Sequence, residues 1–329
     1  MSEFLIVTDA HGATLDDLVT TYKSLVVSGS KDIKWFVYGA VPDAVKHLQR
    51  RWSFRRVRVV ATADEFKTSD FVIFLNAGDG LYREALVNVR ETIHKNVTTD
   101  LIYGDSAHPT GIKAEPLSFV RRPGWSPERL RGHCYVGETL IARAEVVDRA
   151  GGITELVVQH PHDRALRLSE NAKNIVRMPE LLTTAKSRDT RPSASLDAVI
   201  KHCARQKIDA NCELDAAVPS VRVKRNLTTQ PSVAVIVPTR GTSAEVFGSE
   251  RVLVVEAVRS LFEKSTYQNF EVVVVADTPT PQTVLETLQE IGGTRLKIIN
   301  YDRPFNFAEK NNLGAMSCES DLILLLNDD

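Results

Sequence analysis

Leu322-Ile323-Leu324-Leu325-Leu326-Asn327-Asp328-Asp329 is the stretch that decides the fold of this 329-residue chain. A continuous apolar run of this kind is typical of a strand that is buried on both faces of a sheet. The same pattern occurs earlier as Phe71-Val72-Ile73-Phe74-Leu75-Asn76-Ala77-Gly78-Asp79. Aligned without a gap, the two stretches place Gly78 opposite Asp329, so the first has lost or displaced a carboxylate that the second keeps.

Apolar runs alternate with amphipathic helical patterns in the residues that precede the second stretch. The expected strands are residues 233–237, 270–275, 296–299 and 322–326. Two helices are expected from their apolar stripes, the first at Val254, Val255, Val258, Leu261 and Phe262 and the second at Val284, Leu285, Leu288 and Ile291. A short third helix is expected at 308–316. Thr280 is the expected N-cap of the second helix, Pro281 its first residue and Gly292-Gly293 its end. Such alternation implies a parallel sheet with right-handed crossovers, in which ligands bind at the carboxyl ends of the strands.

The N-terminal part repeats this plan more loosely. Strands are expected at residues 4–7, 35–38, 57–60, 71–75 and 101–103, and helices at 15–25, 82–94, 162–172 and 196–206, with a loop-rich stretch at 121–135. Residues 216–230 are polar, lack a helical stripe and include Pro219 and Pro231 at or next to their ends, which indicates a linker. The expected organisation is therefore a first domain at 1–215, a linker at 216–230 and a second domain at 231–329.

Composition and charge narrow the choice of partners. The chain is 43% hydrophobic and 25% charged, with a formal net charge of −1, so nothing favours nucleic acid or an anionic membrane surface as a partner. No apolar stretch reaches the length of a transmembrane segment. Cys134, Cys203, Cys212 and Cys318 are scattered without a zinc or disulfide spacing, which predicts reduced thiols in a cytoplasmic protein.

Five motifs match, in order and spacing, those of a known enzyme family. They are Pro238-Thr239-Arg240, residues 267–275, residues 301–307, Asn311-Asn312-Leu313-Gly314-Ala315 and residues 324–329. As a set they resemble the family 2 glycosyltransferases, whose nucleotide-binding half begins with a strand ending in Pro-Thr and closes on a strand ending in Asp-x-Asp or Asn-Asp-Asp. The first part of the chain resembles the same family more distantly, through residues 74–79, 101–105, 124–130, 133–137 and 162–168.

The resemblance implies an α/β fold of two Rossmann-like domains of the A-type glycosyltransferase kind. The first domain is expected to be degenerate, and the second to comprise only its N-terminal, nucleotide-binding half. The whole chain then looks like a fragment of a tandem bacterial glycosyltransferase used in surface-polysaccharide assembly, cut short in its second unit. A terminal apolar strand with nothing after it to cover it supports that interpretation.

The same resemblance implies a divalent cation under the donor diphosphate, held by carboxylates and acting as a Lewis acid. Hard oxygen ligands favour Mg²⁺ or Mn²⁺. Asp329 is the leading ligand with Asp328 beside it, and Asn327 and Asp328 are expected to orient the ribose and the diphosphate. The alternative is that these residues merely end a strand and start a turn.

A nucleotide pocket is implied at the other strand ends. Pro238, Thr239 and Arg240 are expected to line the base, although such a tripeptide is also a common turn at the end of a strand. The family places a nucleotide-binding Asp at the position of Ala276, whereas the carboxylate here is one residue later, at Asp277. Asn312, together with Gly314, fits a close approach to the nucleotide, and ordinary helix capping is the competing explanation.

The catalytic base that deprotonates an acceptor hydroxyl is expected beyond Asp329. In the first domain, Asn76, Asp79 and Asp105 are the counterparts of the donor-site residues. The family base falls near Pro161, which cannot take a proton, so that His160, His162 or Asp163 would have to substitute. Trp125 could stack on a sugar ring, or serve only as a packing anchor.

The predicted function is that of an inverting, metal-dependent glycosyltransferase. It would move a sugar from a nucleotide diphosphate sugar to a saccharide acceptor on a growing cell-surface polysaccharide, in the cytoplasm or at the inner membrane face beside polysaccharide-assembly proteins. The alternative is a non-catalytic scaffold that binds nucleotide sugars or carbohydrate. An unrelated nucleotide-binding Rossmann-like fold is disfavoured, because no Gly-x-Gly-x-x-Gly follows either first strand.

Overall fold

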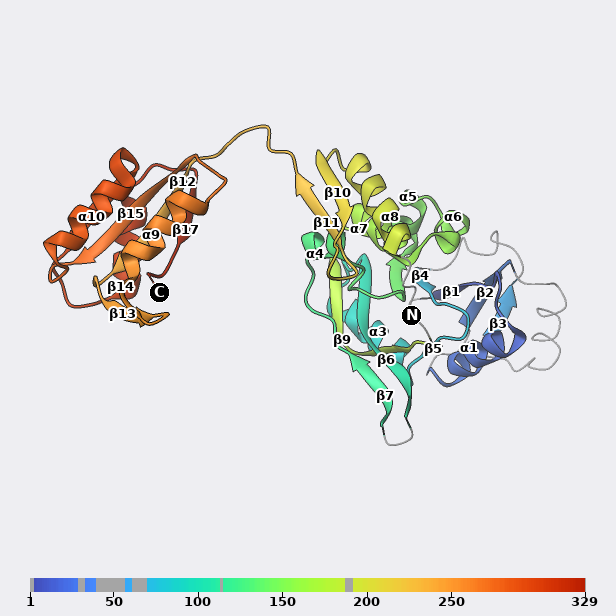
Figure 1. Ribbon diagram of the computed structural model, residues 1–329. Helices are drawn as coiled ribbons and strands as arrows, with labels where there is room; N and C mark the ends of the chain where they lie inside the picture. Colours follow the sequence, from blue (N-terminus) through green and yellow to red (C-terminus); the bar gives the residue numbers. More distant parts are fainter. Residues whose placement is uncertain are drawn as a thin grey trace. The chain divides into compact units, whose positions relative to one another are not determined.

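The computed structural model describes residues 3–28, 33–39, 57–60, 70–112, 115–186 and 192–328. It divides into two compact units, Met1–Asn226 and Leu227–Asp329, which are described separately (Figure 1). Asp329, the leading metal ligand in the sequence analysis, lies outside the described residues. In the part of the chain that the structure describes, no helix is both long and apolar enough to cross a bilayer.

A mixed sheet runs through the N-terminal unit. Its strands are β1 (Phe4–Asp9), β2 (Ile33–Tyr38), β3 (Val57–Val60), β4 (Phe71–Phe74), β5 (Gly80–Leu81), β6 (Leu101–Ile112), β7 (Glu115–Val120), β8 (Leu140–Arg143) and β9 (Ile175–Thr184). Their order among the described residues is β3-β2-β1-β4-β8-β6-β9-β5, and β7 pairs with β6. The first four are mutually parallel and match the predicted apolar runs, whereas β8 is antiparallel to both its neighbours. The sequence patterns did not predict β5, β7, β8 or β9.

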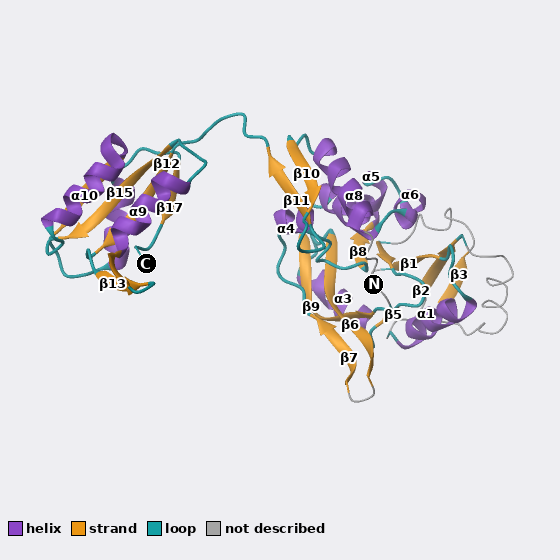
Figure 2. Ribbon diagram, viewed as in Figure 1, coloured by secondary structure: helices purple, strands orange, loops and turns teal. Residues whose placement is uncertain are grey.

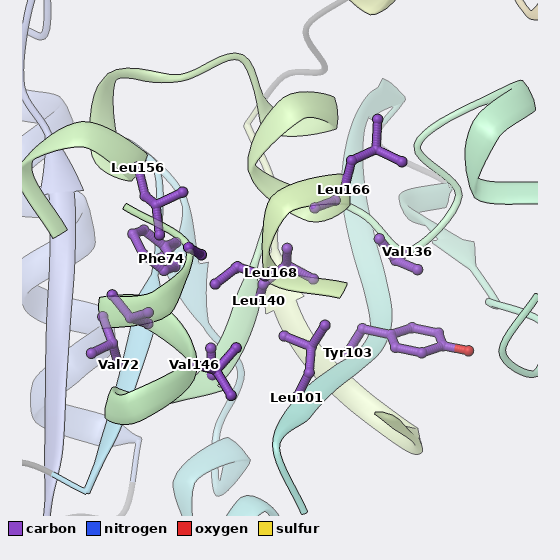
Figure 3. Close-up of a cluster of buried hydrophobic side chains, with 14 of the residues drawn as sticks. Val72, Phe74, Leu101, Tyr103, Val136, Leu140, Val146, Leu156, Leu166 and Leu168 are labelled. Atoms are coloured by element: carbon purple, nitrogen blue, oxygen red, sulfur yellow. The ribbon is translucent and has the colours of Figure 1, made fainter. Parts of the chain in front are cut away.

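Helices bury both faces of this sheet (Figure 2). The helices are α1 (Leu15–Val27), α3 (Ala85–Lys95), α4 (Pro127–Gly132), α5 (Ala144–Arg149), α6 (Ile153–Val158), α7 (Pro161–Asn171) and α8 (Pro192–Arg205). Side chains of β4 alternate between two hydrophobic clusters: Phe71 and Ile73 pack with α1 and α3, whereas Val72 and Phe74 pack with α4 to α8. Figure 3 shows Val72 and Phe74 among the side chains of the second cluster. The predicted burial of this strand on both faces is thereby confirmed.

A hairpin at the end of the N-terminal unit occupies part of the predicted linker. β10 (Ala210–Leu214) pairs antiparallel with β11 (Val221–Arg225). Val221 is buried in the cluster that contains α8, and Val223 packs against it. β11 therefore lies within the stretch 216–230 that the sequence suggested as a linker, and the two compact units divide between Asn226 and Leu227. The alternation of valine with charged residues in β11 is a period-two pattern of the kind that a half-buried strand shows.

The C-terminal unit has three layers, with a parallel sheet between helices. Its elements are β12 (Val233–Thr239), the hairpin β13 (Ser243–Val246) and β14 (Ser249–Val252), α9 (Leu253–Lys264), β15 (Phe270–Asp277), α10 (Gln282–Gly292), the 3₁₀ turn η2 (Gly293–Arg295), β16 (Leu296–Tyr301), α11 (Phe307–Met316) and β17 (Leu322–Leu325). The sheet order is β16-β15-β12-β17, and each neighbouring pair is parallel, as predicted. α9 and α10 cover one face, and α11 packs on the other.

Local details differ from prediction at α10. Its N-cap is Pro281 rather than Thr280. The Thr280 hydroxyl is buried and makes no hydrogen bond within the described residues, so the predicted capping role is wrong. Gly293 caps the C-terminal end with φ at +53°, a left-handed conformation that favours glycine, which confirms the predicted end of the helix.

β17 is a half-exposed edge strand. Leu322, Ile323, Leu324 and Leu325 are between 45% and 57% exposed. The prediction of a strand buried on both faces is therefore wrong for this copy of the pattern within the described chain. β17 pairs with β12 along one edge, but the apolar side chains on its faces remain accessible to solvent.

Candidate functional site

Polar groups from neighbouring strands meet at the carboxyl end of the C-terminal sheet. β12 lies between β15 and β17, so Thr239 at its end can contact residues on both sides. The Thr239 hydroxyl donates a hydrogen bond to Oδ2 of Asp328, which follows β17, and accepts one from the backbone N–H of Gly241 at 2.9 Å. Thr239 and Asp328, which the sequence placed in one site, are therefore in direct contact.

Lys310 is buried completely at the same edge of the sheet. Its Nζ donates to Oδ1 of Asp277 and to the carbonyl oxygen of Thr239, each at 2.7 Å. The same nitrogen lies 5.6 and 5.7 Å from the ring centres of Tyr301 and Phe305. A lysine is almost never buried without partners, because the desolvation cost must be offset by charge pairing and hydrogen bonds. Lys310 therefore links the ends of β12 and β15 and fixes the Asp277 carboxylate.

The position of Asp277 explains the one-residue departure from the family pattern. Ala276 is 2% exposed and belongs to the hydrophobic cluster under α9 and α10. Because neighbouring residues of a strand point to opposite faces, Asp277 has its side chain on the side of α11, where it meets Lys310. Oδ2 of Asp277 also lies 3.6 Å from Nε of Arg240, whose guanidinium stacks 5.7 Å from the centre of the Phe305 ring.

Other predicted residues of this unit are more scattered. Pro238 is buried within β12, Asn327 is exposed, and Asn312 is exposed on α11. A Cβ at Gly314 would lie 2.4 Å from Cγ2 of Ile236 and 3.2 Å from Cγ2 of Val275, so this glycine serves the contact between helix and sheet. Asn312 therefore faces solvent, and Gly314 packs against β12 and β15.

Sequence reasoning missed Lys310 and its neighbour Asn311. Asn311 is buried, its Nδ2 donates to the carbonyl oxygen of Phe307, and its Oδ1 has no hydrogen-bond partner within the described residues. The sequence could have indicated the lysine. Lys310 precedes Gly314 by four residues, so both lie on the side of α11 that faces the sheet. Asn312, the residue that the motif suggested, is turned to solvent by a further step along the helix.

The N-terminal unit contains a pocket of about 510 Å³. Asp79, Glu138, His160, Pro161 and His162 are among the residues that line it. Four of the residues singled out in the sequence, Asp79, His160, Pro161 and His162, are therefore brought to one cavity. Glu138, which no motif pointed to, lies in the same wall.

Asp79 is a buried carboxyl group at 3% exposure. Its Oδ1 accepts a hydrogen bond from the backbone N–H of Lys186 at 2.5 Å, and Asn76 donates to its Oδ2 at 3.4 Å. Burial, reinforced by the negative charge of Glu138, raises the pKa of Asp79 from 3.8 to about 7. Gly78 beside it has φ at +86°, and a Cβ there would meet the side chains of Lys186 and Asp17 at 2.9 and 3.0 Å.

Two other predicted carboxylates, Asp105 and Asp163, are engaged elsewhere. Asp105 accepts a hydrogen bond from the backbone N–H of Arg122 at 2.8 Å and pairs with Arg177 at 3.3 Å. Asp163 bonds to Nε of Arg167 at 2.9 Å and lies 3.4 Å from the Arg205 guanidinium. Neither lines the pocket. Both are held in ion pairs with arginines, which is a sufficient structural reason for their burial.

Trp125 also lies away from the pocket. Its ring centre is 6.5 Å from that of Tyr103, and it packs against the cluster shown in Figure 3, which includes Tyr103. Trp125 also lines a second cavity of about 380 Å³, so its surroundings fit both the packing role and the stacking role.

The donor groups that could hold a cation lie in the C-terminal unit. Within the described residues, no group of three or more His, Cys, Asp or Glu side chains is arranged to hold a metal ion. Asn327 and Asp328 follow β17 and offer hard oxygen ligands, the type that suits Mg²⁺ or Mn²⁺. The chemistry of this donor set is compatible with a hard divalent cation.

Comparison with known proteins gives one family and several relatives. Residues 235–329 match the family model described as glycosyl transferase family 2. The O-antigen biosynthesis protein RfbC of Myxococcus xanthus is 30% identical over 300 residues, which is 83% of this chain and 23% of that protein. An uncharacterized protein, y4gI of Sinorhizobium fredii, is 24% identical over 312 residues, which is 89% of this chain and 33% of that protein. The chain thus spans a third or less of the length of these curated relatives.

Solved structures of low identity are also similar to part of the chain. A crystal structure of S. aureus TarS in complex with UDP is 11% identical, with a TM-score of 0.43, and the match covers 61% of this chain and 65% of that chain. The mannosyltransferase PcManGT from Pyrobaculum calidifontis, in complex with GDP-Man and Mn²⁺, is 12% identical with a TM-score of 0.40 and coverage of 62% and 64%.

The family match extends from within β12 through the end of β17, and so contains the Thr239, Asp277, Lys310 and Asp328 group. It confirms the resemblance that the motifs predicted, because residues 235–329 match the model of the family 2 glycosyl transferases.

Proposed function

We propose that the C-terminal unit forms the donor-binding half of a glycosyltransferase that uses nucleotide diphosphate sugars. The observation that carries this proposal is the convergence of Thr239, Asp277, Lys310 and Asp328 at the carboxyl ends of adjacent parallel strands. In open parallel sheets, ligands bind in the crevice outside these ends, at the point where strand order reverses. Here the reversal falls at β12, between β15 and β17.

Each group has a proposed part in donor binding. Asp277, held by Lys310, faces the end of the sheet as a fixed acceptor for N–H or O–H groups of the nucleoside. Pro238, Thr239 and Arg240 form the wall on the β12 side, and Arg240 lies beside Phe305 as a flat surface against which a base could stack. Asn327 and Asp328 are proposed to contact ribose and diphosphate. Asn312, which is exposed on α11, is retained only as an outer contact.

We propose that Mg²⁺ or Mn²⁺ is held by Asp328 and Asp329. When bound, such a cation supplies charge compensation to the departing diphosphate. Thr239 orients the Asp328 carboxylate by donating to Oδ2. An inverting displacement also needs a base that deprotonates the acceptor hydroxyl.

The N-terminal unit is proposed to be a related but degenerate domain. Its strands β3-β2-β1-β4 have the same parallel order as β16-β15-β12-β17, and β4 and β17 carry the repeated sequence pattern. Two observations support loss of the metal-dependent chemistry. Gly78 replaces the carboxylate in a left-handed conformation, and Asp105 and Asp163 are held by arginines. This unit is therefore proposed to bind a ligand rather than to catalyse transfer.

The acceptor is proposed to be a growing cell-surface polysaccharide. The support is the similarity to RfbC, an O-antigen biosynthesis protein. A cytoplasmic position, at the inner membrane face beside polysaccharide-assembly proteins, is proposed as part of the same hypothesis.

Donor binding by the 329-residue chain tests the proposal directly. Isothermal titration calorimetry in Mn²⁺ measures the binding of UDP-, GDP- and dTDP-sugars. We expect at least one of these donors to bind, and its affinity to fall at least tenfold when EDTA replaces Mn²⁺. Asp328→Asn and Asp329→Asn should each reproduce most of that loss. Glu319→Gln is the matched control, because Glu319 is an exposed carboxylate that precedes the amino end of β17. If the donor binds with equal affinity in EDTA and in Mn²⁺, the metal assignment is wrong. If none of the donors binds, the proposed donor site is wrong.

A further inference from the structure

Two of the four cysteines meet in the N-terminal unit. Cys203 lies near the end of α8 and is buried, and Cys212 lies in the middle of β10 and is partly buried. Their Sγ atoms are 3.9 Å apart. Their spacing in the sequence matches no disulfide or zinc motif. It is the packing of the β10–β11 hairpin against α8 that brings the two thiols together (Figure 1).

The other two thiols contact the backbone instead. Sγ of Cys134 donates to the carbonyl oxygen of Gly137 at 3.6 Å, and Sγ of Cys318 donates to the carbonyl oxygen of Ala315 at 3.2 Å. Cys318 also belongs to the other compact unit. Cys203 and Cys212 are therefore the two cysteines that the fold places in sulfur–sulfur contact.

The contact is close enough for a covalent bond after a small rearrangement. The S–S bond of a disulfide is about 2 Å long, so the two sulfur atoms have to approach each other by about 2 Å. Rotation about the Cα–Cβ bond of a cysteine moves its sulfur over a distance of this size. Cys203 belongs to the hydrophobic cluster under the hairpin and Cys212 packs against the same cluster, so the bond can form while the hairpin stays on α8.

We propose that Cys203 and Cys212 are a redox-sensitive pair, which a low-molecular-weight disulfide oxidises to a disulfide between α8 and β10. The thiolate of Cys212, the more exposed of the two, attacks one sulfur of the oxidant, forms a mixed disulfide and releases one thiolate. The thiolate of Cys203 then attacks Sγ of Cys212, forms the protein disulfide and releases the second thiolate. The two protons of the cysteines pass to the two released thiolates. One small disulfide is thereby reduced to two thiols while the two cysteines are oxidised.

The surroundings of Cys212 make the first step slow. Burial, and after it the neighbouring Cys203 thiol, raise the pKa of Cys212 to about 11, so only a small fraction is thiolate at neutral pH. The second step is intramolecular, because the two sulfur atoms are already in contact. The pair therefore stays reduced in a reducing compartment, and it responds to sustained oxidation rather than to a brief exposure.

Charged side chains of the two elements point away from the pair or are already bonded. On the hairpin, the charged residues that alternate in sequence with Cys212 and Val223 are exposed on the other face: Glu213, Arg222 and Lys224. On α8, His202 and Arg205 both bond to Glu170 of α7. The raised pKa of Cys212 therefore follows mainly from its burial.

The disulfide joins two segments of one pocket wall. Ser195 of α8, Leu214 at the end of β10 and Val221 at the start of β11 are among the residues that line the cavity of about 510 Å³. A bond between α8 and β10 limits how far the hairpin can separate from the helix, so oxidation makes this wall more rigid. The proposal does not depend on the donor site of the C-terminal unit, and either can fail alone.

Peptide mapping of the full 329-residue chain tests the bond. The reduced chain is incubated with oxidised glutathione at pH 8.5, its free thiols are alkylated, and it is cut with trypsin. Arg205 and Lys207 lie between the two cysteines, so trypsin separates the cysteines unless a disulfide links their peptides. We expect residues 202–205 to be linked to residues 208–222 and to be released by reduction. Thiol titration of the unfolded protein should fall from four free cysteines to two.

Two variants and a rate measurement sharpen the test. Cys203→Ser should keep glutathione on Cys212 as a stable mixed disulfide, because the thiol that would displace it is gone. Cys318→Ser is the matched control and should form the linked peptides like the unaltered chain. Amide hydrogen exchange in β10 and β11 should become several-fold slower on oxidation of the unaltered chain, and should not change in this way in Cys203→Ser.

Several results would overturn the proposal. These are four free thiols after prolonged incubation, a linked peptide that contains Cys134 or Cys318 in place of the pair, or glutathione retained on Cys212 in the unaltered chain. Unchanged hydrogen exchange in an oxidised hairpin would remove the proposed effect on the pocket wall. Circular dichroism shows whether Cys203→Ser is folded, and the mapping of the unaltered chain needs no variant.

Discussion

Single residues show where sequence reasoning works and where it stops. Thr239 and Asp328 were predicted to share a site and do lie in contact, because Thr239 ends β12 and Asp328 follows β17, the strand that pairs with it. Asn312 was chosen from a motif, yet Lys310 and Asn311 are the polar side chains of α11 that are buried. One residue along a helix is a rotation of about 100°, so a motif names the right turn without naming the right side. No local pattern marks Glu138, whose role depends on Asn76 from another strand end.

Lys310 is the residue whose removal should matter most to the C-terminal unit. Lys310→Met keeps the length of the side chain but leaves Asp277 without its buried cation. Breaking a buried pair by removing one partner costs about 3–5 kcal/mol, so we expect the free energy of unfolding of this unit to fall by about 3 kcal/mol. Donor affinity should fall as well, because Asp277 loses the group that orients it.

Urea denaturation followed by circular dichroism measures this loss. Lys264→Met is the matched control, since Lys264 is exposed at the end of α9. The double variant Lys310→Met with Asp277→Asn should recover part of the stability, because no buried charge then lacks a partner. A Lys310→Met protein as stable as the control would mean that the ion pair contributes nothing to the fold.

At the scale of elements, continuous apolar runs predicted strands correctly, whereas polar or half-buried strands were not predicted from the sequence. β1, β2, β4, β12 and β15 read as continuous hydrophobic stretches, and each was predicted. β13 and β14 are short and largely exposed, so no buried face imposes a pattern on them, whereas β11 has a period-two pattern that is only five residues long. β17 was predicted to be buried because the run is apolar, but what covers a strand is decided by distant residues, and its side chains are about half exposed.

Close packing of α11 on the sheet rests on Gly314. A methyl group there would meet Cγ2 of Ile236 at 2.4 Å, and Ile236 is completely buried, so the helix would have to move outward. Alanine is favoured over glycine in a helix by about 1 kcal/mol, whereas overpacking a core costs about 1–3 kcal/mol. We expect Gly314→Ala to destabilise the C-terminal unit by about 1 kcal/mol net.

The matched control is Asn312→Ala on the exposed side of the same helix, which should leave the unfolding midpoint unchanged or raise it slightly. Because α11 also carries Lys310, a shift of the helix in Gly314→Ala should lengthen the contact between Nζ and Asp277 and lower donor affinity. A Gly314→Ala variant more stable than the original would show that helix propensity outweighs the contact with Ile236.

On the scale of the whole molecule, the chain is two units built on the same order of four parallel strands. The repeated sequence pattern of β4 and β17 indicated this, because strands with the same pattern are expected at the same position in two similar sheets. The division of labour between the units did not follow from it. The N-terminal pocket is formed by segments separated by more than sixty residues in sequence, as in the contact between Asn76 and Glu138, and such contacts leave no periodic signal.

The stability of the N-terminal unit depends on pH through two buried groups, Asp79 and His162, whose pKa values are shifted in opposite directions. The pKa of Asp79 is raised from 3.8 to about 7, so the folded unit holds a proton that the unfolded chain releases, and stability falls as pH rises between these values. Burial lowers the pKa of His162 from 6.5 to about 4, so the unfolded chain holds a proton that the folded unit lacks, and stability rises with pH in that window. Between pH 4 and 6.5 the two slopes are opposite in sign and similar in size.

We therefore expect the stability of the N-terminal unit to be nearly flat between pH 4.5 and 6.5, and single variants to reveal the hidden slopes. With Asp79→Asn only the histidine remains, so the free energy of unfolding should rise by about 1.4 kcal/mol per pH unit; with His162→Gln it should fall by a similar amount. Trp35, Trp52 and Trp125 all precede residue 227, so tryptophan fluorescence during urea unfolding reports this unit selectively. Parallel pH profiles for the unaltered chain and both variants would contradict the assignment of a protonated Asp79 and a neutral His162. Opposite slopes in the two variants would support it.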